Sequence, residues 1–388
     1  MSEKISQIET ESNFSTADLT SLKKVWYRRV DWPVTLFLLL TPLATLILVP
    51  TYLYSESLSW KLILFTVLFA GATNLSITAG YHRLFSHKSY EAHPLVKAVY
   101  LLIGASAWQA SALKWSSDHR IHHGKVDTDH DPYSIQKGFW YAHMGWLFFK
   151  DSTNPHPKAP DLEKDWMIRF QHKYYIPVAI LMSFGFPTLV GYWLGAPWGG
   201  FIFAGALRIV LTQQSTFFVN SLCHTLGQKT YSEDVSARDS FIVALLTHGE
   251  GYHNFHHNFQ LDYRNGIRWY QWDPTKWTIR TLAFLGLAKK LRRISQAEIL
   301  KARLQMEAMR IRSKGYSLEK TEQLREKILS AQISMRKMQQ EYKCLKHQMQ
   351  NSSQEKLAQL KIEIEIRKIE FRSSMQQWKV YLKGPQIA

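Results

Sequence analysis

Four long apolar runs constrain the fold of this chain more than any other feature. They lie at 33–54, 62–79, 174–195 and 201–221, and Arg208 is the only charged residue in any of them. About 20 consecutive apolar residues can cross a hydrocarbon core roughly 30 Å thick. The alternative, buried helices of a large soluble protein, explains poorly why the runs come in two close pairs. We therefore expect an all-α integral membrane protein with four transmembrane helices.

Basic residues outside the runs indicate the orientation. The connection between the first two runs has one basic residue, Lys61, and the connection between the last two has none. The segment before the first run contains Lys23, Lys24, Arg28 and Arg29. Because segments rich in Lys and Arg stay on the cytoplasmic side, we expect both termini in the cytoplasm.

The chain has 16 histidines, and most of them are clustered. Three motifs stand out, at 82–87, 119–123 and 253–257, and His224 follows at the end of the last run. On a helix, positions i, i+3 and i+4 share one face, so each H-x-x-H-H motif can aim its imidazoles at a common point. The five-residue step from His82 to His87 does not stay on one face, so the helix should end or distort there.

Imidazole is a good ligand for iron, zinc, copper and nickel. Nine clustered histidines are too many for one ion but would give two ions four or five ligands each. A structural zinc site is not expected, because it would normally include cysteines and the chain has only Cys223 and Cys344. For the other histidines we expect ordinary polar roles: His93, His130, His143, His156, His172, His248 and His347.

A fifth apolar stretch, 95–113, separates the first two histidine motifs. If it crossed the membrane, these motifs would lie on opposite faces. Lys97, Trp108 and Gln109 also suit an interface or a protein interior better than lipid. We expect this stretch not to cross and to line the active site, with every histidine cluster on the cytoplasmic side.

The segments 80–90, 118–123 and 250–257 resemble the three histidine boxes of the stearoyl-CoA-type delta-9 membrane fatty acid desaturases in spacing, order and flanking residues. The resemblance runs from about residue 30 to 290 and includes 129–132, 138–146, 220–224 and 262–264. It implies a di-iron centre (Fe2+/Fe3+) in a cytoplasmic helical cap, with Asn220 reaching one iron through a water. The implied ligands are His82, His87, His119, His122, His123, His224, His253, His256 and His257.

The activity that the resemblance implies is O2-dependent insertion of a cis double bond, at the delta-9 position, into a long acyl chain. An external carrier, ferredoxin or cytochrome b5, must supply two electrons, because the sequence has no haem or flavin motif. A membrane di-iron alkyl hydroxylase is the alternative enzyme, although its histidines are spaced differently. A metal transporter or sensor is the alternative outside enzymes, but its ligands would be expected near the middle of the bilayer.

The resemblance also implies where the substrate binds. Gln109, Trp115 and Thr216 match residues that shape the bend of the acyl tunnel, while Asp118 and Lys150 match residues near the head group. Three head-group positions differ, however, because Phe37, Ala110 and Ser117 stand where acyl-CoA members have two asparagines and an arginine. The acyl carrier therefore stays open between coenzyme A, acyl carrier protein and a glycerolipid.

Beyond the region of resemblance the chain is strongly basic. From Lys289 to the end, 23 Lys and Arg stand against 10 Asp and Glu, a net charge of +13 out of +17 for the whole chain. An alternating four- and three-residue spacing indicates a coiled-coil seam, broken at 351–353 and followed by another helix. The seam is Leu324, Ile328, Ala331, Met335, Met338, Tyr342, Leu345 and Met349.

This tail is expected to form a helical hairpin or an oligomerising stalk, and a solvated helix without a partner is the alternative. Its positive charge favours contact with anionic membrane lipid, at about 1 kcal/mol for each basic residue. Nucleic-acid binding is not expected. We divide the chain into a polar cytoplasmic N-terminus (1–30), a membrane fatty acid desaturase domain (31–288) and a basic helical, coiled-coil-like tail (289–388).

Overall fold

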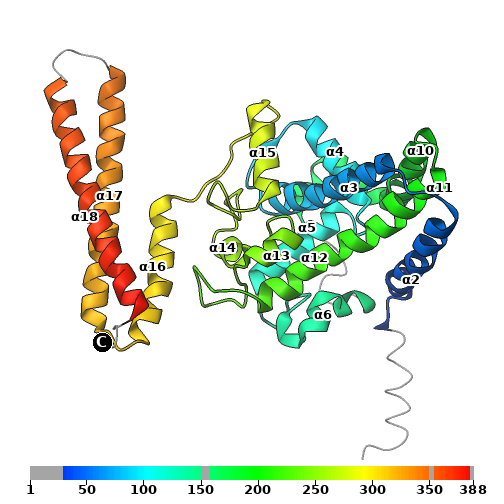
Figure 1. The fold of residues 1–388 in the computed structure, drawn as a ribbon, viewed down its shortest axis with the longest axis horizontal. Coiled ribbons are helices and arrows are strands. Elements are labelled where there is room, and N and C mark those ends of the chain that lie inside the picture. Colours follow the sequence, from blue (N-terminus) through cyan, green and yellow to red (C-terminus); the bar gives the residue numbers. More distant parts are fainter. Residues whose placement is uncertain (1–28, 151–157, 349–353, 385–388) are drawn as a thin grey trace, which may run out of the picture.

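The computed structural model describes residues 29–150, 158–348 and 354–384, which are mostly helical (Figure 1). Among the described residues, four helical segments are long and apolar enough to cross a membrane. They are Trp32–Ser55, Trp60–Ser86, Tyr175–Trp193 and Pro197–Thr225. These segments coincide with the four apolar runs, so the prediction of an all-α chain with four spans is confirmed.

Three of the four spans change their helical geometry along their length. The second span is α3 (Trp60–Leu75) followed by the π-helix η1 (Ser76–Ser86). The third consists of α9 (Tyr175–Ile180), the π-helix η4 (Leu181–Gly185) and α10 (Phe186–Trp193). The fourth consists of α11 (Pro197–Gly199), the π-helix η5 (Gly200–Leu207) and α12 (Arg208–Thr225). Such i→i+5 geometry is rare and is often found at functional sites.

The first span, α2 (Trp32–Ser55), and α3 form a hairpin with a short connection. Asp31 caps α2 by accepting a hydrogen bond from the Val34 amide at 3.3 Å. Ser59 caps α3 in the same way, with the Leu62 amide at 3.2 Å. These caps satisfy amide groups that have no partner within the helix.

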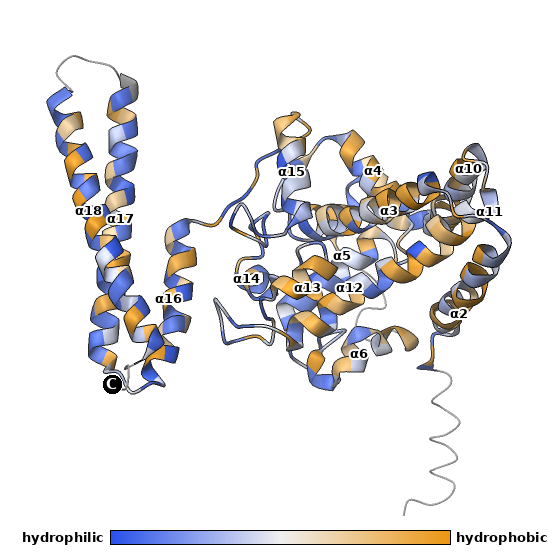
Figure 2. Cartoon of the chain, in the orientation of Figure 1, coloured by the Kyte–Doolittle hydropathy of each residue, from blue (hydrophilic) through white to orange (hydrophobic). Residues whose placement is uncertain are grey.

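The outer faces of the spans are apolar and exposed. Leu46 and Ile47 on α2 are 72% and 58% exposed, and Val67 and Leu68 on α3 are 61% and 62% exposed. Figure 2 shows the same faces in orange along α2, α3 and α10. An apolar surface of this extent marks contact with lipid or with another protein, and here it lies on helices that are long enough to cross a membrane.

The fifth apolar stretch forms a short helix, α4 (Pro94–Ala105), then an irregular loop at 106–111, then α5 (Ala112–Lys125). The 12 residues of α4 are about 18 Å long, which is too short to cross a bilayer. The stretch is therefore broken rather than spanning, as predicted. Its loop, and not α4 itself, lines the cavity described below.

The remaining elements of this body surround the histidine-bearing ends of η1 and α12. They are a two-stranded antiparallel sheet, β1 (Glu91–Ala92) with β2 (Ala288–Lys289), and a set of short helices. The helices are η2 (Ile135–Lys137), α6 (Phe139–His143), η3 (Gly145–Phe148), α7 (Pro160–Glu163), α8 (Trp166–Lys173), α13 (Phe241–Leu246), α14 (His253–Asn258) and α15 (Pro274–Phe284).

The tail forms three helices, α16 (Gln296–Arg312), α17 (Leu318–Gln348) and α18 (Gln354–Lys383), and α17 and α18 make a long hairpin (Figure 1). The predicted seam is buried in its first half, at Leu324, Ile328 and Ala331, and only half-buried from Met335 onward. Met349 and the interruption at 351–353 lie outside the described residues. The hairpin alternative for the tail is thus the one that the structure adopts.

Candidate functional site

Nine histidines converge in two adjacent groups. The first group is His82, His87, His119, His123 and His256, and the second is His122, His224, His253 and His257. Within each group, one imidazole nitrogen from every member lies within 4.8 Å of the corresponding nitrogens of the others. These are the nine histidines predicted from the sequence, and the fold brings them together from four separate segments.

The π-helix η1 explains how two residues five positions apart reach the same group. In a helix with i→i+5 hydrogen bonds, a five-residue step returns close to the starting face. The His87 amide donates to the His82 carbonyl at 3.1 Å, so the turn between them has this geometry. We predicted a helix end or a distortion at this step. The structure contains a distortion, which begins earlier, at Ser76 within the span.

The two H-x-x-H-H motifs do not each point to one centre. On α5, His119 and His123 belong to the first group, whereas His122 belongs to the second. On α14 the split is reversed, because His256 belongs to the first group, whereas His253 and His257 belong to the second. The expectation of a common point for each motif is therefore wrong. Each helix lies between the two groups and contributes to both.

Buried acceptors fix the orientation of several rings through the Nδ1 atom. His82 Nδ1 lies 3.0 Å from Glu250, and His122 Nδ1 lies 2.9 Å from Asp131. His224 Nδ1 lies 2.7 Å from the Ser236 hydroxyl, which donates to Asp127 at 2.6 Å. An acceptor at Nδ1 leaves the lone pair of Nε2 free, which is the usual arrangement around histidine metal ligands.

Burial and neighbouring imidazoles favour the neutral form of six of the nine clustered rings. They hold the pKa well below the usual histidine value for His87, His119, His123, His253, His256 and His257. Although burial alone would raise the pKa of Glu250, His82 and Arg83 lower it to about 2. The site thus presents neutral nitrogen donors next to an ionised carboxylate.

The donor atoms fit a pair of metal ions. His82 Nε2 lies 2.9 Å from His256 Nε2, and His87 Nε2 lies 2.8 Å from His119 Nε2. In each pair at most one of the two Nε2 atoms can carry a hydrogen that points at the other. At least one lone pair of each pair therefore points into the space between the rings, where a metal ion could bind. His224 Nε2 is buried and has no partner among the described residues. Buried polar atoms normally have partners, so this orphaned nitrogen supports a metal in the second group.

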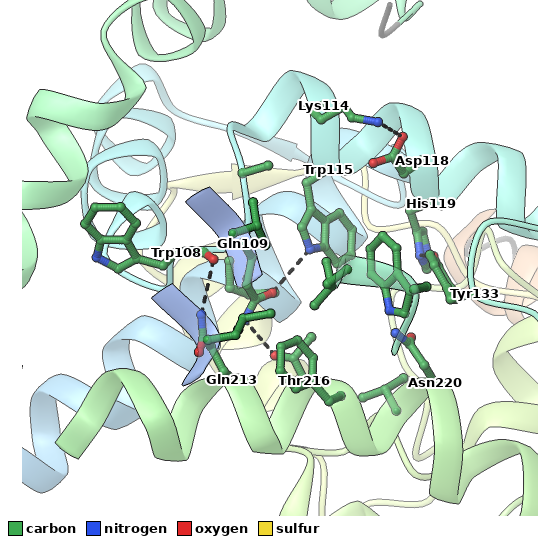
Figure 3. A pocket seen from close by; sticks show the side chains of 18 of the residues that line it. Trp108, Gln109, Lys114, Trp115, Asp118, His119, Tyr133, Gln213, Thr216 and Asn220 are labelled. Atoms are coloured by element: carbon green, nitrogen blue, oxygen red, sulfur yellow. Dashed lines mark hydrogen bonds and ion pairs between the residues drawn. The ribbon is translucent and has the colours of Figure 1, made fainter. Parts of the chain in front are cut away.

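A largely apolar cavity of about 500 Å³ ends at the first group. His82 and His119 form part of its wall, as do Asn220 and Glu250. Figure 3 shows Trp108 and Gln213 at one side of the cavity and His119, Tyr133 and Asn220 at the other. Asn220 precedes His224 by one helical turn on α12, which places it beside the histidines as predicted.

The three residues predicted to shape the bend form a hydrogen-bonded chain in the cavity wall. Gln109 Nε2 donates to Thr216 Oγ1 at 2.9 Å, and Trp115 Nε1 donates to Gln109 Oε1 at 3.3 Å. The Trp115 indole stacks on the His119 ring, with centroids 4.9 Å apart. Both ends of the Gln109 amide are thus fixed beside the first histidine group (Figure 3).

The predicted head-group residues have different positions. Asp118 lines the cavity and pairs with Lys114 at 2.8 Å. Lys150 is exposed and follows Phe149, which lines the cavity, and its amide donates to the Arg29 carbonyl at 2.8 Å. Ser117 is not part of the wall, since its buried hydroxyl accepts a hydrogen bond from the Lys158 amide at 3.0 Å.

Other histidines have polar roles outside the two groups, as expected. His143 bonds to Ser221 and Gln214, at 2.9 and 3.0 Å, and His172 bonds to Ser111 at 2.6 Å. His93 caps α4, His130 is exposed, and His248 is a mostly buried loop residue. His156 and the side chain of His347 lie outside the described parts of the chain.

Sequence reasoning missed the carboxylates that orient the rings. Glu250 and Asp131 were part of the matched segments 250–257 and 129–132 but were given no role. Glu250 lies three residues before the motif at 253–257, and Asp131 lies eight residues after the motif at 119–123. This closeness to a histidine motif is the signal that could have identified them. Phe37 was also unassigned as a cavity residue. Its ring stacks on Trp108 with centroids 4.7 Å apart.

The fold and the site together define a multi-pass membrane protein with two adjacent histidine groups that could hold metal ions, beside an apolar cavity. The family model "Fatty acid desaturase" matches residues 58–287. The chain therefore belongs to the fatty acid desaturase family, and the predicted resemblance is confirmed.

Named relatives of this family differ in their carriers. The chain is 46% identical to "Acyl-CoA desaturase 1" of Saccharomyces cerevisiae over 256 residues, which are 65% of this chain and 50% of that protein. It is 37% identical to "Stearoyl-CoA desaturase 5" of Bos taurus over 58% of this chain and 70% of that protein. It is 39% identical to "sn-2 palmitoyl-lipid 9-desaturase" of Nostoc sp. (strain 36) over 56% of this chain and 76% of that protein. The match thus spans only about half the length of the yeast relative.

Proposed function

We propose that the chain is a membrane fatty acyl desaturase that inserts a cis double bond, at the delta-9 position, into a long acyl chain. The observation that supports this most directly is the contact between the cavity and the metal centre. His82 and His119 belong to the first histidine group and also form part of the wall of an apolar cavity. An alkyl chain in that cavity would present a methylene group directly to this group.

We propose iron as the metal, with about two ions per chain, one in each histidine group. Bound iron would supply the activation of O2 and the removal of two hydrogen atoms from the acyl chain. The reaction consumes O2, two external electrons and two protons, and it yields the alkene and two waters. A separate ferredoxin or cytochrome b5 would deliver the electrons.

The protein's own residues position the substrate and the ligands. The hydrogen-bonded chain of Gln109, Thr216 and Trp115 would hold the acyl chain bent beside the histidines. Asn220 would contact the second ion through a water, because it lies one turn before His224 on α12. Glu250 holds His82 in the tautomer whose Nε2 is free, and its ionised carboxylate offsets part of the charge of the metals.

The acyl carrier would bind at the end of the cavity that contains Lys114 and Asp118. The relatives named for an acyl-CoA substrate are 46% and 37% identical to this chain, and the relative named for a palmitoyl-lipid is 39% identical, so both carriers are tested. Lys114, which lines the cavity, and Lys150, which follows the cavity residue Phe149, could meet a phosphate of coenzyme A. If coenzyme A is the carrier, Lys114→Ala should raise the apparent KM for acyl-CoA about tenfold. If a glycerolipid is the carrier, the apparent KM for acyl-CoA should be similar in Lys114→Ala and in the wild type.

Both termini and the metal centre would face the cytoplasm, as the distribution of basic residues indicates. The tail, from about residue 289, would lie on the same side. Its positive charge would favour anionic lipid, and its hairpin could join a second copy of the chain. These assignments can be checked by protease accessibility in sealed vesicles and by the mass of the detergent-solubilised protein.

Expression in a desaturase-deficient host, followed by mass spectrometry of total fatty acids, tests the proposed activity. We expect a new monounsaturated product from the wild type and none from His257→Ala, with equal membrane insertion of both. A hydroxylated product would instead identify an alkyl hydroxylase. The position of the histidines argues against a metal transporter, because His224 lies at the end of the fourth span and His87 just beyond the second.

A further inference from the structure

The loop between α4 and α5, residues 106–111, has an unusual backbone. Trp108 has a φ of +55° and Ala110 a φ of +69°, although neither is glycine. L-residues rarely adopt this left-handed conformation, because Cβ approaches the following carbonyl. Gln109, the central residue of the bend, lies between them. Such strain persists only where the surrounding structure holds the backbone in place.

Two other spans both bond to the Ser106 carbonyl of this loop, and Gln213 of the fourth span also donates to the Trp108 carbonyl at 3.3 Å. Arg208 Nη1 donates to the Ser106 carbonyl at 2.9 Å, and the Ser183 hydroxyl donates to the same oxygen at 3.1 Å. Trp108 Nε1 in turn donates to Ser183 Oγ at 2.8 Å. Ser183 lies in η4 of the third span and Arg208 at the start of α12 in the fourth. The loop is thus bonded to both spans at Ser106 and at Trp108, its first strained residue.

Arg208 is an unexpected residue at this place. It is fully buried, and no carboxylate lies within 4 Å of it among the described residues. Besides the Ser106 carbonyl, its guanidinium contacts the Ala204 carbonyl at 2.8 Å and lies over the Phe69 ring, 4.7 Å from the centroid. A charged side chain within a span is costly and usually functional. Through the Ser106 carbonyl, Arg208 bonds to the loop that bears Gln109.

We propose that Arg208 and Ser183 are positioning residues that determine which methylene of the acyl chain faces the metal centre. Neither residue lines the cavity, so neither touches the substrate. They act by fixing the loop, which fixes Gln109 against Thr216 and Trp115. This inference rests on the proposed desaturase function. If the loop relaxes, the bend moves relative to the histidines, and the double bond forms at a different carbon in a fraction of turnovers.

Ser183→Ala and Arg208→Lys, made in the full chain, test this inference. In the desaturase-deficient host, each should raise the share of minor double-bond isomers about fivefold, which corresponds to the loss of one hydrogen bond. Thr45→Ala is the matched control. Thr45 is also a buried hydroxyl in a span, but among the described residues it bonds only to the Thr41 carbonyl of its own helix, at 2.8 Å. Its isomer ratio should equal that of the wild type.

Hydrogen exchange of the loop amides in the purified proteins gives a second measurement that does not need activity. Residues 106–111 should exchange several-fold faster in Ser183→Ala than in the wild type or Thr45→Ala. Unchanged exchange would overturn the role of Ser183 in holding the loop. If Arg208→Lys fails to accumulate, Ser183→Ala carries the test alone, because it removes a single oxygen atom.

The outcomes separate this inference from the proposed function. Less product with an unchanged isomer ratio would show a merely structural role and would overturn the inference while leaving the desaturase function intact. A wild type that makes no alkene would refute the proposed function. In that case faster hydrogen exchange in Ser183→Ala would still support the role of Ser183 in holding the loop, and unchanged exchange would refute that role.

Discussion

Glu250 shows how one buried side chain can support several parts of a metal site. Its carboxylate contacts His82 Nδ1 at 3.0 Å, Arg83 Nη2 at 2.8 Å and Asn265 Nδ2 at 2.7 Å. Arg83 is adjacent to His82 on η1, so Glu250 fixes both the ring and the helix that carries it. It lies three residues before His253 and therefore connects the first histidine motif to the last.

Replacing this carboxylate should weaken the metal site without removing a ligand. We predict that Glu250→Gln lowers the metal affinity about 10- to 100-fold, because the amide neither carries a charge nor accepts as strongly from His82 Nδ1. Metal content after dialysis against graded chelator concentrations measures the effect. Glu163→Gln is the control, since Glu163 bonds to the Ala159 amide outside the site. Equal metal retention in Glu250→Gln and the wild type would contradict this role.

At the scale of single residues, the sequence identified the ligands better than their supports. Nine histidines stood out because they are clustered and because their spacing matches a family. Ser236 and Asp127 orient His224. Ser236 lies 12 residues after His224 in the chain, and Asp127 lies 109 residues before Ser236. No local pattern joins them, because only the folded chain places the Ser236 loop against the turn that follows α5.

Among the elements, the contact between η1 and α4 positions the first histidine motif. The two helices approach closely at two glycines. A Cβ atom at Gly104 would lie 2.7 Å from the Tyr81 ring, and one at Gly80 would lie 2.8 Å from Tyr100. Both rings are buried, so neither can move away without disturbing the packing.

We predict that Gly104→Ala destabilises the protein by about 1–3 kcal/mol through overpacking of this contact. It should also lower the metal content, because η1 carries His82. Gly71→Ala in α3 is a matched control, since no atom lies within 4 Å of the position its Cβ would take. That change should be neutral or stabilise by up to about 1 kcal/mol. Thermal unfolding in detergent compares the two, and an equal shift in both would contradict the packing argument.

The spans could be predicted because each is a continuous apolar run, and the non-spanning α4 because it separates two histidine motifs. A distortion at the step from His82 to His87 was also predicted, but the extent of η1 back to Ser76 and the strained loop at 106–111 could not be predicted. The hydrogen-bonding pattern of η1 depends on histidine contacts with α5 and α14, which are distant in the sequence. The loop depends on Arg208 and Ser183 in two other spans. Tertiary contacts, rather than local preference, determine both features.

For the molecule as a whole, the tail is joined to the desaturase body by an ordered connection. The Ile294 amide donates to Asp262 at 2.9 Å, and the Arg292 amide donates to the Ser89 carbonyl at 2.8 Å. Ser295 then begins α16 with a capping box. The tail has a core of its own, in which Trp378 Nε1 donates to Glu307 at 2.7 Å.

We predict that a chain ending at Ser295 keeps its metal and its activity, because it retains every proposed ligand and the connection to Asp262. Its membrane-surface binding or oligomeric state should change, since it loses the helices of the tail and a net charge of +9 out of +17. Product yield for each metal-loaded chain and the mass in detergent measure the two effects. A well-folded, metal-loaded truncation without activity would show that the tail takes part in turnover, for example by recruiting the electron donor.

The central claim is that the two histidine groups hold two iron ions. Metal analysis of the purified full chain by mass spectrometry tests it most directly, with one variant for each group. We expect about two iron ions per chain in the wild type and about one fewer in both His87→Ala, from the first group, and His224→Ala, from the second. Zinc in place of iron in the wild type would contradict the claim. A metal content that falls in only one of the two variants would also contradict it.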